Sequence, residues 1–291
     1  MNWNIHRKII FILLLVCLSF HLHGQRSKSG RFRKTFTLHL GSGTASYFGD
    51  LIEDGKYNSR YNINAGFMYN IVNRLTVGLD VTFFRLAGDD SKGINWERNL
   101  SFASSNMEFL PVFQVSFFDP GVRFYNRVML NPYLFGGVGG LYYNPTAKLD
   151  GKSHALRPLT TELVEYSRFT VTYAFGAGVR FKANAFLDVI LDAGFRYTGS
   201  DYLDDVSDAY PTDNWEELTE LGQQLSDRSG EVGADPPHSV RGVIRGNPDR
   251  NDAYFLGNVK VAYYFSPIQD SFRAMQYKGT KRRMKKGRRR R

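Results

Sequence analysis

Cysteine is almost absent from this chain of 291 residues, and no apolar run in it is long enough to cross a membrane as a helix. The one cysteine, Cys17, lies inside the apolar run 9–20. The remaining chain therefore cannot form a disulfide framework. A transmembrane helix needs about 20 apolar residues, and the run 9–20 is much shorter. If the chain crosses a membrane, a closed β-barrel is the remaining way to do so, because it satisfies every backbone polar group within hydrocarbon.

Acidic residues are absent from the C-terminal segment 278–291, and this absence explains the formal net charge of +10. Ten basic residues in that segment account for the whole excess, so the rest of the chain is neutral. No aromatic residues are interleaved with them, which does not favour a nucleic-acid target. Two alternatives stay open: a disordered, solvated tail, or a tail that binds inner-leaflet phosphates, peptidoglycan carboxylates or an acidic protein partner. The candidate partner-binding residues are Lys278, Lys281, Arg282, Arg283, Lys285, Lys286, Arg288, Arg289, Arg290 and Arg291.

The N-terminus has the pattern of a secretory signal peptide. Arg7 and Lys8 precede the apolar run 9–20, and a short polar stretch leads to an expected cleavage site near Gly24. We therefore expect a signal peptide at 1–24, a periplasmic segment at 25–34, a folded domain at 35–265 and a basic periplasmic tail at 266–291.

Strict alternation of apolar and polar residues is the main pattern between residues 35 and 265. Successive side chains of a strand point to opposite faces, so each alternating segment has one apolar and one polar face. Eight segments alternate in this way, and bacterial outer-membrane barrels have even strand numbers. The predicted strands are 35–46, 60–71, 75–86, 103–117, 131–143, 169–182, 185–198 and 253–265.

The connections between these strands fall into two classes of length. Residues 73–74 and 183–184 form tight turns, whereas 48–59, 87–102, 144–168 and 199–252 are long loops. Short periplasmic turns and long extracellular loops are typical of outer-membrane barrels. The connection 118–130 is the exception, and we expect it to extend a hairpin into the periplasm. The sequence thus predicts an all-β, eight-stranded antiparallel transmembrane β-barrel in the outer membrane of a Gram-negative bacterium, with both termini periplasmic.

Charged residues at polar-face positions of these strands balance four acids against four bases. A barrel of about eight strands is narrow enough for side chains to fill its interior. We therefore expect a salt-bridged interior, with an ion or proton path as the alternative. The inward residues are Asp80, Glu108, Asp188, Asp192, Arg180, Lys182, Arg196 and Lys260, with His39 inward as well.

Aromatic residues are frequent at the strand ends, where two interfacial belts are expected. The glycine-rich stretch 135–140 lacks the lysine and the strand-to-helix setting of a phosphate-binding loop. We expect its glycines to allow curvature or the close approach of a side chain that fills the interior. The residues assigned to the belts are Tyr47, Phe48, Phe117, Phe118, Tyr142, Tyr143, Tyr197, Tyr202, Tyr254 and Tyr263.

Candidates for catalysis are few. After the signal peptide only His39, His154 and His238 remain, and the adjacent Ser153 and His154 have no visible third group to orient a base. We therefore expect no catalytic residues and no cofactor.

The loop 199–252 is strongly acidic, with thirteen acids against four arginines between Asp201 and Asp252. Its carboxylates could bind Ca²⁺ or Mg²⁺, although their spacing differs from the helix-loop-helix calcium pattern. An ordinary turn-rich loop is the favoured interpretation, with a short helix at 214–225 capped by Asp213 or Asn214. The carboxylates of the metal alternative are Asp201, Asp204, Asp205, Asp208 and Asp213.

Several segments resemble the PorG family of small outer-membrane barrels of the type IX secretion system: 45–51, 132–139, 225–229, 245–248 and 252–254. The most specific element is the run Asp201, Tyr202, Leu203, Asp204, Asp205, Val206 and Ser207. The resemblance implies a non-enzymatic accessory component that meets the periplasmic PorK and PorN ring from the membrane side.

The resulting hypothesis is a barrel that anchors or positions the periplasmic ring in protein secretion and gliding motility. Its partners would be outer-membrane lipid and PorK- and PorN-like proteins. One alternative is a general structural barrel that stabilises the envelope through its acidic loops and basic tail. A second alternative is a lipid-modifying barrel enzyme.

Overall fold

The computed structural model describes residues 35–51, 59–120, 127–211, 213–235, 237–241 and 243–265. The chain divides into two units, Met1–Phe32 and Arg33–Arg291, and every described residue belongs to the second. The predicted signal peptide 1–24, the segment 25–34 and the basic tail 266–291 lie outside the described residues. Among the described residues, no helix is long and apolar enough to span a membrane.

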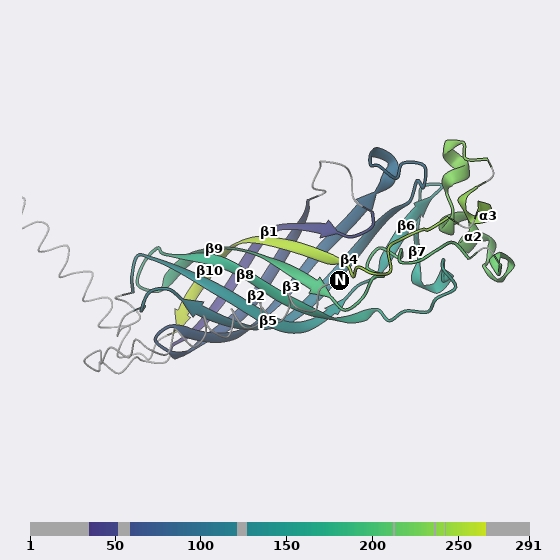
Figure 1. Cartoon of the computed structure of the whole chain (residues 1–291). Coiled ribbons are helices and arrows are strands. Elements are labelled where there is room, and N and C mark those ends of the chain that lie inside the picture. Colours follow the sequence, from purple (N-terminus) through teal and green to yellow (C-terminus); the bar gives the residue numbers. More distant parts are fainter. Residues whose placement is uncertain are drawn as a thin grey trace, which may run out of the picture. The chain divides into compact units, whose positions relative to one another are not determined.

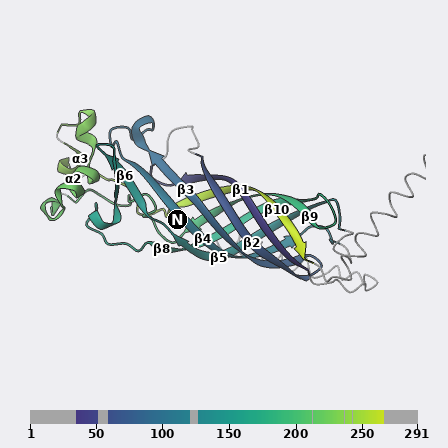
Figure 2. The same ribbon diagram turned by 180° about the vertical axis from the view of Figure 1, so that it is seen from behind.

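Eight long antiparallel strands form the body of the second unit (Figures 1 and 2). Each predicted alternating segment is a strand, and the predicted boundaries differ from the observed ones by three residues or fewer. The fold class predicted from the sequence is confirmed. The eight strands are β1 Phe36–Phe48, β2 Arg60–Val72, β3 Leu75–Asp89, β4 Ser101–Ser116, β5 Leu130–Tyr142, β8 Phe169–Lys182, β9 Leu187–Thr198 and β10 Ala253–Phe265.

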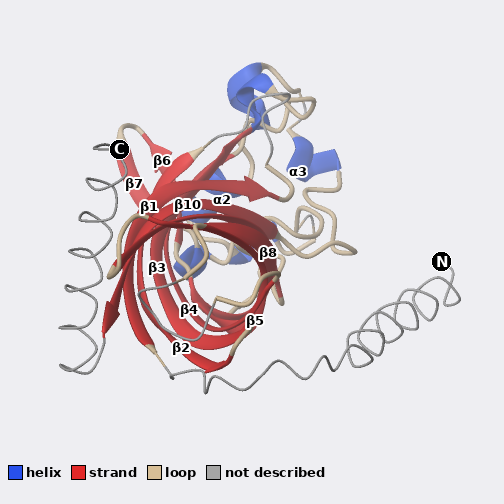
Figure 3. Ribbon diagram, turned by 90° about the vertical axis from the view of Figure 1, so that its left-hand side faces the viewer, coloured by secondary structure: helices blue, strands red, loops and turns tan. Residues whose placement is uncertain are grey.

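The sheet closes on itself because its first and last strands are paired. β1 pairs with β2 and also with β10, in a register that runs from Phe36 opposite Phe265 to Phe48 opposite Ala253. β3 pairs with β4, which completes the ring seen along the barrel axis in Figure 3. Closure removes the unpaired edges that an open sheet would expose. We call the end with the tight turns 73–74 and 183–186 the turn end, and the opposite end the loop end.

A short hairpin extends the sheet beyond the barrel at the loop end. Its strands are β6 Pro145–Leu149 and β7 Lys152–Ala155, and β6 pairs with β4 through Ala103 and Thr146. Asp150 and Gly151 connect the two strands with φ of +51° and +77°, as an Asp-Gly hairpin turn requires. The sequence predicted a long loop over 144–168. The connection is long, but it contains this hairpin, because four paired residues on each side of a favourable turn are enough to form one.

The outward face of the barrel carries exposed aliphatic and aromatic side chains. Polar and charged side chains point inward, as the alternation requires. The exposed apolar side chains include Phe36, Leu38, Leu40, Ile63, Phe83, Phe109, Phe113, Val115, Leu134, Val138, Val171, Phe175, Leu191, Phe195, Val259 and Val261.

Three residues assigned to the aromatic belts point inward instead. Tyr47, Tyr143 and Tyr254 are buried. In β1 and β10 this follows from strand parity, because Tyr47 shares a face with His39 and Tyr254 shares a face with Lys260. Outward exposure holds for other members of the predicted set, including Phe117, Phe118, Tyr197 and Tyr263.

The two α-helices among the described residues lie in the long connection between β9 and β10, at the loop end (Figure 1). α2 spans Glu220–Ser226 and α3 spans His238–Arg241. α2 begins six residues later than predicted, because the Thr219 side chain caps it by accepting the N–H of Gly222. Asn214 instead precedes a short 3-10 turn, Trp215–Glu217.

The glycines of β5 permit a close approach by a neighbouring strand. A Cβ on inward-facing Gly137 or Gly139 would lie 2.2 Å from a carbonyl oxygen of β4, and each would also contact the Leu110 side chain. Leu110 is fully buried in the interior. The expectation that this stretch accommodates an interior-filling side chain is confirmed.

Candidate functional site: the sealed interior and its acidic plug

Arg127, in the connection between β4 and β5, closes the barrel interior at the turn end. Its guanidinium donates to Asp188 Oδ1 at 2.6 Å and to the Ala185 carbonyl at 3.0 Å. It also lies 3.7 Å above the centre of the Tyr264 ring. A guanidinium suits this place because its planar group can donate and stack at the same time. Tyr264 in turn donates to Asp188 Oδ2 at 2.8 Å.

Lys260 organises the middle of the interior by bridging two acids. Its ammonium lies 3.0 Å from Asp80 Oδ2 and 2.9 Å from Asp192 Oδ2. His39 Nε2 lies 2.9 Å from the other oxygen of Asp80, and Tyr133 donates to Asp192 at 3.1 Å. Because every one of these groups is buried, each charge depends on its partners for compensation.

A third set of charges lies nearer the loop end. Tyr254 donates to Glu108 Oε2 at 2.5 Å, and Arg196 Nε lies 3.5 Å from the same oxygen. The two remaining predicted bases lie toward the turn end, where Arg180 donates to Gln114 and Lys182 donates to the Arg127 carbonyl. All eight inward charges predicted from the alternation therefore face the interior. Their arrangement favours a filled interior over the alternative of an ion or proton path.

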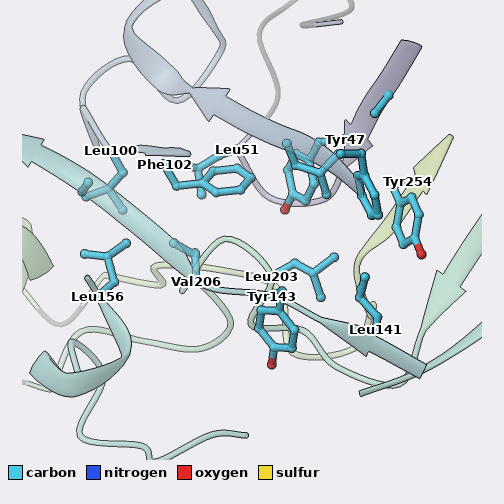
Figure 4. Close-up of a cluster of buried hydrophobic side chains, with 14 of the residues drawn as sticks. Tyr47, Leu51, Leu100, Phe102, Leu141, Tyr143, Leu156, Leu203, Val206 and Tyr254 are labelled. Carbon is cyan, nitrogen blue, oxygen red and sulfur yellow. The ribbon is translucent and has the colours of Figure 1, made fainter. Parts of the chain in front are cut away.

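Loop 199–252 fills the mouth of the barrel at the loop end with apolar side chains. Both Leu203 and Val206 are buried in this cluster. In Figure 4, Leu203 lies among Tyr47, Tyr254, Leu141 and Tyr143, and Val206 lies toward Phe102 and Leu156. The sequence motif 201–207 is thus the central part of a plug. We use "plug" for this buried segment and the loop residues that contact it.

Two plug carboxyl groups share a tyrosine from the barrel wall. Tyr47 Oη lies 2.6 Å from both Asp204 Oδ2 and Asp252 Oδ1. Burial raises the pKa of both carboxyls well above the usual range. The negative charge of Asp252 adds to the shift at Asp204, and the negative charges of Asp201 and Asp50 add to the shift at Asp252. Since one phenol proton can serve one acceptor, the second contact calls for a proton on a carboxyl group. The pair therefore holds a proton under conditions in which exposed aspartates are ionised.

Asp205 binds a second group of plug residues. It accepts hydrogen bonds from Tyr166 at 2.6 Å and from Thr161 at 2.5 Å. Burial raises the pKa of Asp205 to about 6, although Arg245 opposes this shift. Arg245 donates to Glu162 Oε1 at 2.7 Å and to the Asp205 carbonyl at 2.5 Å. Glu162 also accepts the N–H groups of Ser207 and Asp208.

Arg98 connects three loops of the plug. It pairs with Asp90 through hydrogen bonds of 2.6 and 2.8 Å and donates to the Asp50 carbonyl at 2.8 Å. It also donates to the carbonyl of Arg245. Arg98 and Arg245 are both buried, so their paired contacts hold loops 48–59, 87–102 and 199–252 together.

Asp201 has no hydrogen bond of good geometry to either carboxyl oxygen within the described part of the chain, although the Ser207 side chain lies close enough to lower its pKa. The residue is only 8% exposed. Burial, with the nearby negative charges of Asp50 and Glu162, raises the pKa of Asp201 to about 7.

The aspartates proposed as ligands of Ca²⁺ or Mg²⁺ do not come together around one site. Asp204 contacts Tyr47, Asp205 contacts Tyr166 and Arg245, and Asp213 is exposed. Within the residues that the structure describes, no three histidine, cysteine or acidic side chains are placed to hold a metal ion.

The remaining sequence candidates lie apart from one another. Ser153 and His154 are consecutive in β7, so their side chains project to opposite faces of the strand. His39 pairs with Asp80, and His238 lies against Tyr210 with ring centres 6.2 Å apart. The ten basic tail residues lie outside the described residues, so their role stays a prediction.

Sequence reasoning missed Arg98, Arg127, Glu162 and Arg245. All four lie in connections that carry no alternation, and nothing in the local sequence distinguishes them from solvent-exposed charges. Only the fold brings them to buried partners.

Residues 11–217 match the sequence pattern of the outer membrane protein beta-barrel domain family. The chain belongs to this family. The match covers more than half of the chain and extends from the N-terminal apolar run into the plug loop. Membership in this outer membrane protein family, together with the closed barrel, indicates location in the outer membrane. No curated protein sequence gives a significant match.

Solved outer-membrane barrels are similar to this family member at low identity. Neisserial surface protein A shares 11% identity over 81% of this chain and 98% of its own, with a TM-score of 0.40. OprG from Pseudomonas aeruginosa shares 12% over 81% and 99%, with a TM-score of 0.42. Ail of Yersinia pestis shares 12% over 80% and 100%, with a TM-score of 0.38.

Proposed function

We propose that this protein is a non-enzymatic outer-membrane component of the type IX protein secretion and gliding machinery. In this proposal the barrel is an anchor: its loops face the cell exterior, and its termini and turn end face the periplasm. The basic tail and the connection 118–130 then position the periplasmic ring of PorK- and PorN-like proteins.

The observation that carries the proposal is that the barrel interior is occupied from end to end. Arg127 closes the turn end, the Lys260 pairs occupy the middle, and the plug fills the mouth. A sealed barrel offers a secreted protein no passage, so a role in secretion would have to be accessory. This fits the role implied by the resemblance to the PorG family, whose most specific motif, 201–207, forms the plug here.

A non-enzymatic role is supported by the placement of the nucleophile and base candidates. Ser153 and His154 project from opposite faces of β7, which prevents them from acting as a nucleophile and its base. His39 is held against Asp80 inside the barrel.

The experiment that tests the proposal is truncation of the chain after Phe265 in the native host. The barrel strands remain complete, so we expect normal insertion but weaker recovery of ring proteins after crosslinking in intact cells, with reduced secretion and gliding. A matched variant, with the ten basic tail residues changed to glutamine, tests whether positive charge carries the contact. Full recovery of the ring proteins by both variants would place the interface in 118–130, and intact secretion and gliding after gene deletion would exclude the proposal.

The second candidate is a general structural barrel that stabilises the envelope. The sealed interior also favours this function, since a protein without a channel can act through its two surfaces alone. Gene deletion would then increase sensitivity to detergent and chelators without changing secretion.

A further inference from the structure

A pocket of about 490 Å³ opens at the loop end, beside the plug. Its walls come from residues 94–98 between β3 and β4 and from residues 243–247 before β10, together with Asp50 after β1. Small-molecule sites in proteins have volumes of roughly 300–1,000 Å³. The anchoring role proposed above makes no use of this pocket, which we call the rim pocket.

The base of the rim pocket is held in place by buried groups. Arg98 donates to the carbonyls of Asp50 and Arg245, and the N–H of Asn247 donates to Asp50 Oδ2 at 2.9 Å. A Cβ on Gly246 would lie 2.7 Å from the same Asp50 oxygen, so the chain approaches Asp50 as closely as glycine allows. A pocket with a fixed base can bind a ligand without first ordering its own chain.

The lining carries no net charge. Asp50 and Glu97 balance Arg98 and Arg245, and the one other titratable residue of the lining is His238. Both guanidiniums are already paired, Arg98 with Asp90 and Arg245 with Glu162. A phosphate or sulfate would be repelled by the two carboxylates and would find no unpaired cation to compensate. A polycation would be repelled by the two guanidiniums. The lining therefore favours a neutral ligand.

The exposed side chains of the rim pocket include an indole ring and several amide and carboxylate groups. Trp96 is 50% exposed, and Ile244, which also lines the pocket, is 72% exposed. Asn95 and Asn247 add exposed amides, which donate and accept hydrogen bonds, and Glu97 adds an exposed carboxylate, which accepts them. A pyranose ring matches this set, because it presents an apolar C–H face for the indole and a circle of hydroxyls for the amides and carboxylates.

We propose that the rim pocket binds a neutral pyranose sugar, with Trp96 stacking on the ring and Asn95, Glu97 and Asn247 bonding its hydroxyls. The glycan would reach the pocket from the exterior, and this access depends on the loop orientation given under the proposed function. Binding itself does not depend on secretion, so a purified protein separates failure of this inference from failure of the anchoring role.

The test uses the full chain folded in detergent. Trp215→Phe leaves Trp96 as the only tryptophan outside the predicted signal peptide, so its fluorescence reports on the rim pocket. The probes are cellobiose, maltose, lactose and N,N′-diacetylchitobiose, together with delipidated polysaccharide from the host's own outer membrane. We expect a saturable change with at least one free disaccharide if the source is an external glycan, or with the host polysaccharide alone if the source is the cell's own surface. No change is expected with a sulfated disaccharide or an oligolysine peptide.

The variant that decides the question is Trp96→Ala, measured by calorimetry with the sugar that binds best. We expect at least a tenfold loss of affinity, while Trp215→Ala retains the wild-type value as the matched control. Heat-dependent gel migration checks that both variants are folded barrels. The inference is overturned if no sugar binds saturably, if Trp96→Ala binds as well as the wild type, or if the charged probes bind and the neutral sugars do not.

Discussion

At the scale of single residues, buried charges in the plug are held by partners that lie far away in the sequence. Arg245 contacts Glu162 and Asp205, and Arg98 contacts Asp90. Removing one partner leaves the other charge buried without compensation, which costs more than the intact pair contributes. These arginines should therefore determine whether the plug stays packed in the mouth of the barrel.

Arg245→Met should lower the free energy of plug opening by about 3–5 kcal/mol, because Glu162 and Asp205 then lose their cation. Native-state hydrogen exchange of the amides of Val206 and Ser207 measures this opening. Arg250→Met is the matched control, since Arg250 is exposed, and it should leave exchange unchanged. Equal protection in both variants would contradict the stabilising role of Arg245.

The plug should be more stable in mild acid than at neutral pH. Folded Asp201 and Asp205 have pKa values raised to about 7 and about 6, whereas an opened plug exposes carboxyls of ordinary pKa near 4. The folded form therefore binds more protons in this window, and its stability falls as pH rises from about 4 through the raised values. Amide protection, corrected for intrinsic exchange, should be higher at pH 5 than at pH 8.

The variant Asp201→Asn isolates one of these groups. It should remove the part of the pH dependence that Asp201 contributes between about pH 4 and 7, and retain the parts that Asp205 and the Asp204–Asp252 pair contribute. A plug whose protection rises with pH in the wild type would refute the assignment of raised pKa values.

At the scale of elements, each barrel strand supplies one apolar face to the lipid and one polar face to the interior. The charges on the polar faces stabilise the barrel only when they form ion pairs between strands. Lys260 of β10, for example, pairs with Asp80 of β3 and with Asp192 of β9. Strand parity thus fixes which residues are inside, and the closure of the barrel fixes which of them are paired.

Lys260→Met should destabilise the folded barrel by about 3–5 kcal/mol, because Asp80 and Asp192 are left buried together without their shared cation. Urea unfolding followed by gel migration measures the loss. Lys148→Met, at an exposed position of β6, is the matched control and should behave as the wild type. An unfolding midpoint unchanged in Lys260→Met would show that the interior tolerates the unpaired acids, for example through water.

At the scale of the whole molecule, the barrel is a filled cylinder. Its interior is closed at the turn end by Arg127, in the middle by Lys260 and its acids, and at the loop end by the plug. Under the function proposed above, this protein acts through its two ends and its lipid-facing surface.

Purified protein reconstituted in planar bilayers should therefore show no discrete ion conductance, because buried ion pairs and plug side chains occupy the interior among the described residues. A porin inserted under the same conditions provides the positive control. Regular single-channel steps from this protein would contradict the sealed interior.

The sequence by itself determined the strands, the barrel and the identity of the inward charges. Alternation is a local property, and a strand converts it directly into two faces, so His39 and Lys260 could be assigned to the interior without the structure. The same parity would have assigned Tyr47 and Tyr254 to the interior, against their interpretation as belt residues.

Only the tertiary structure decided the partners and the plug. Arg127, Arg245 and Glu162 lie in segments without periodicity, and their buried contacts join residues up to 147 positions apart through Arg98 and Arg245. Such contacts depend on how the loops fold over the mouth, which local sequence does not encode. The acidic run 201–207 illustrates this difference. From its composition, the sequence analysis predicted a solvent-exposed loop or a metal site. In the folded protein the run is a buried plug, and its carboxyl groups contact tyrosine and arginine side chains from other loops and strands.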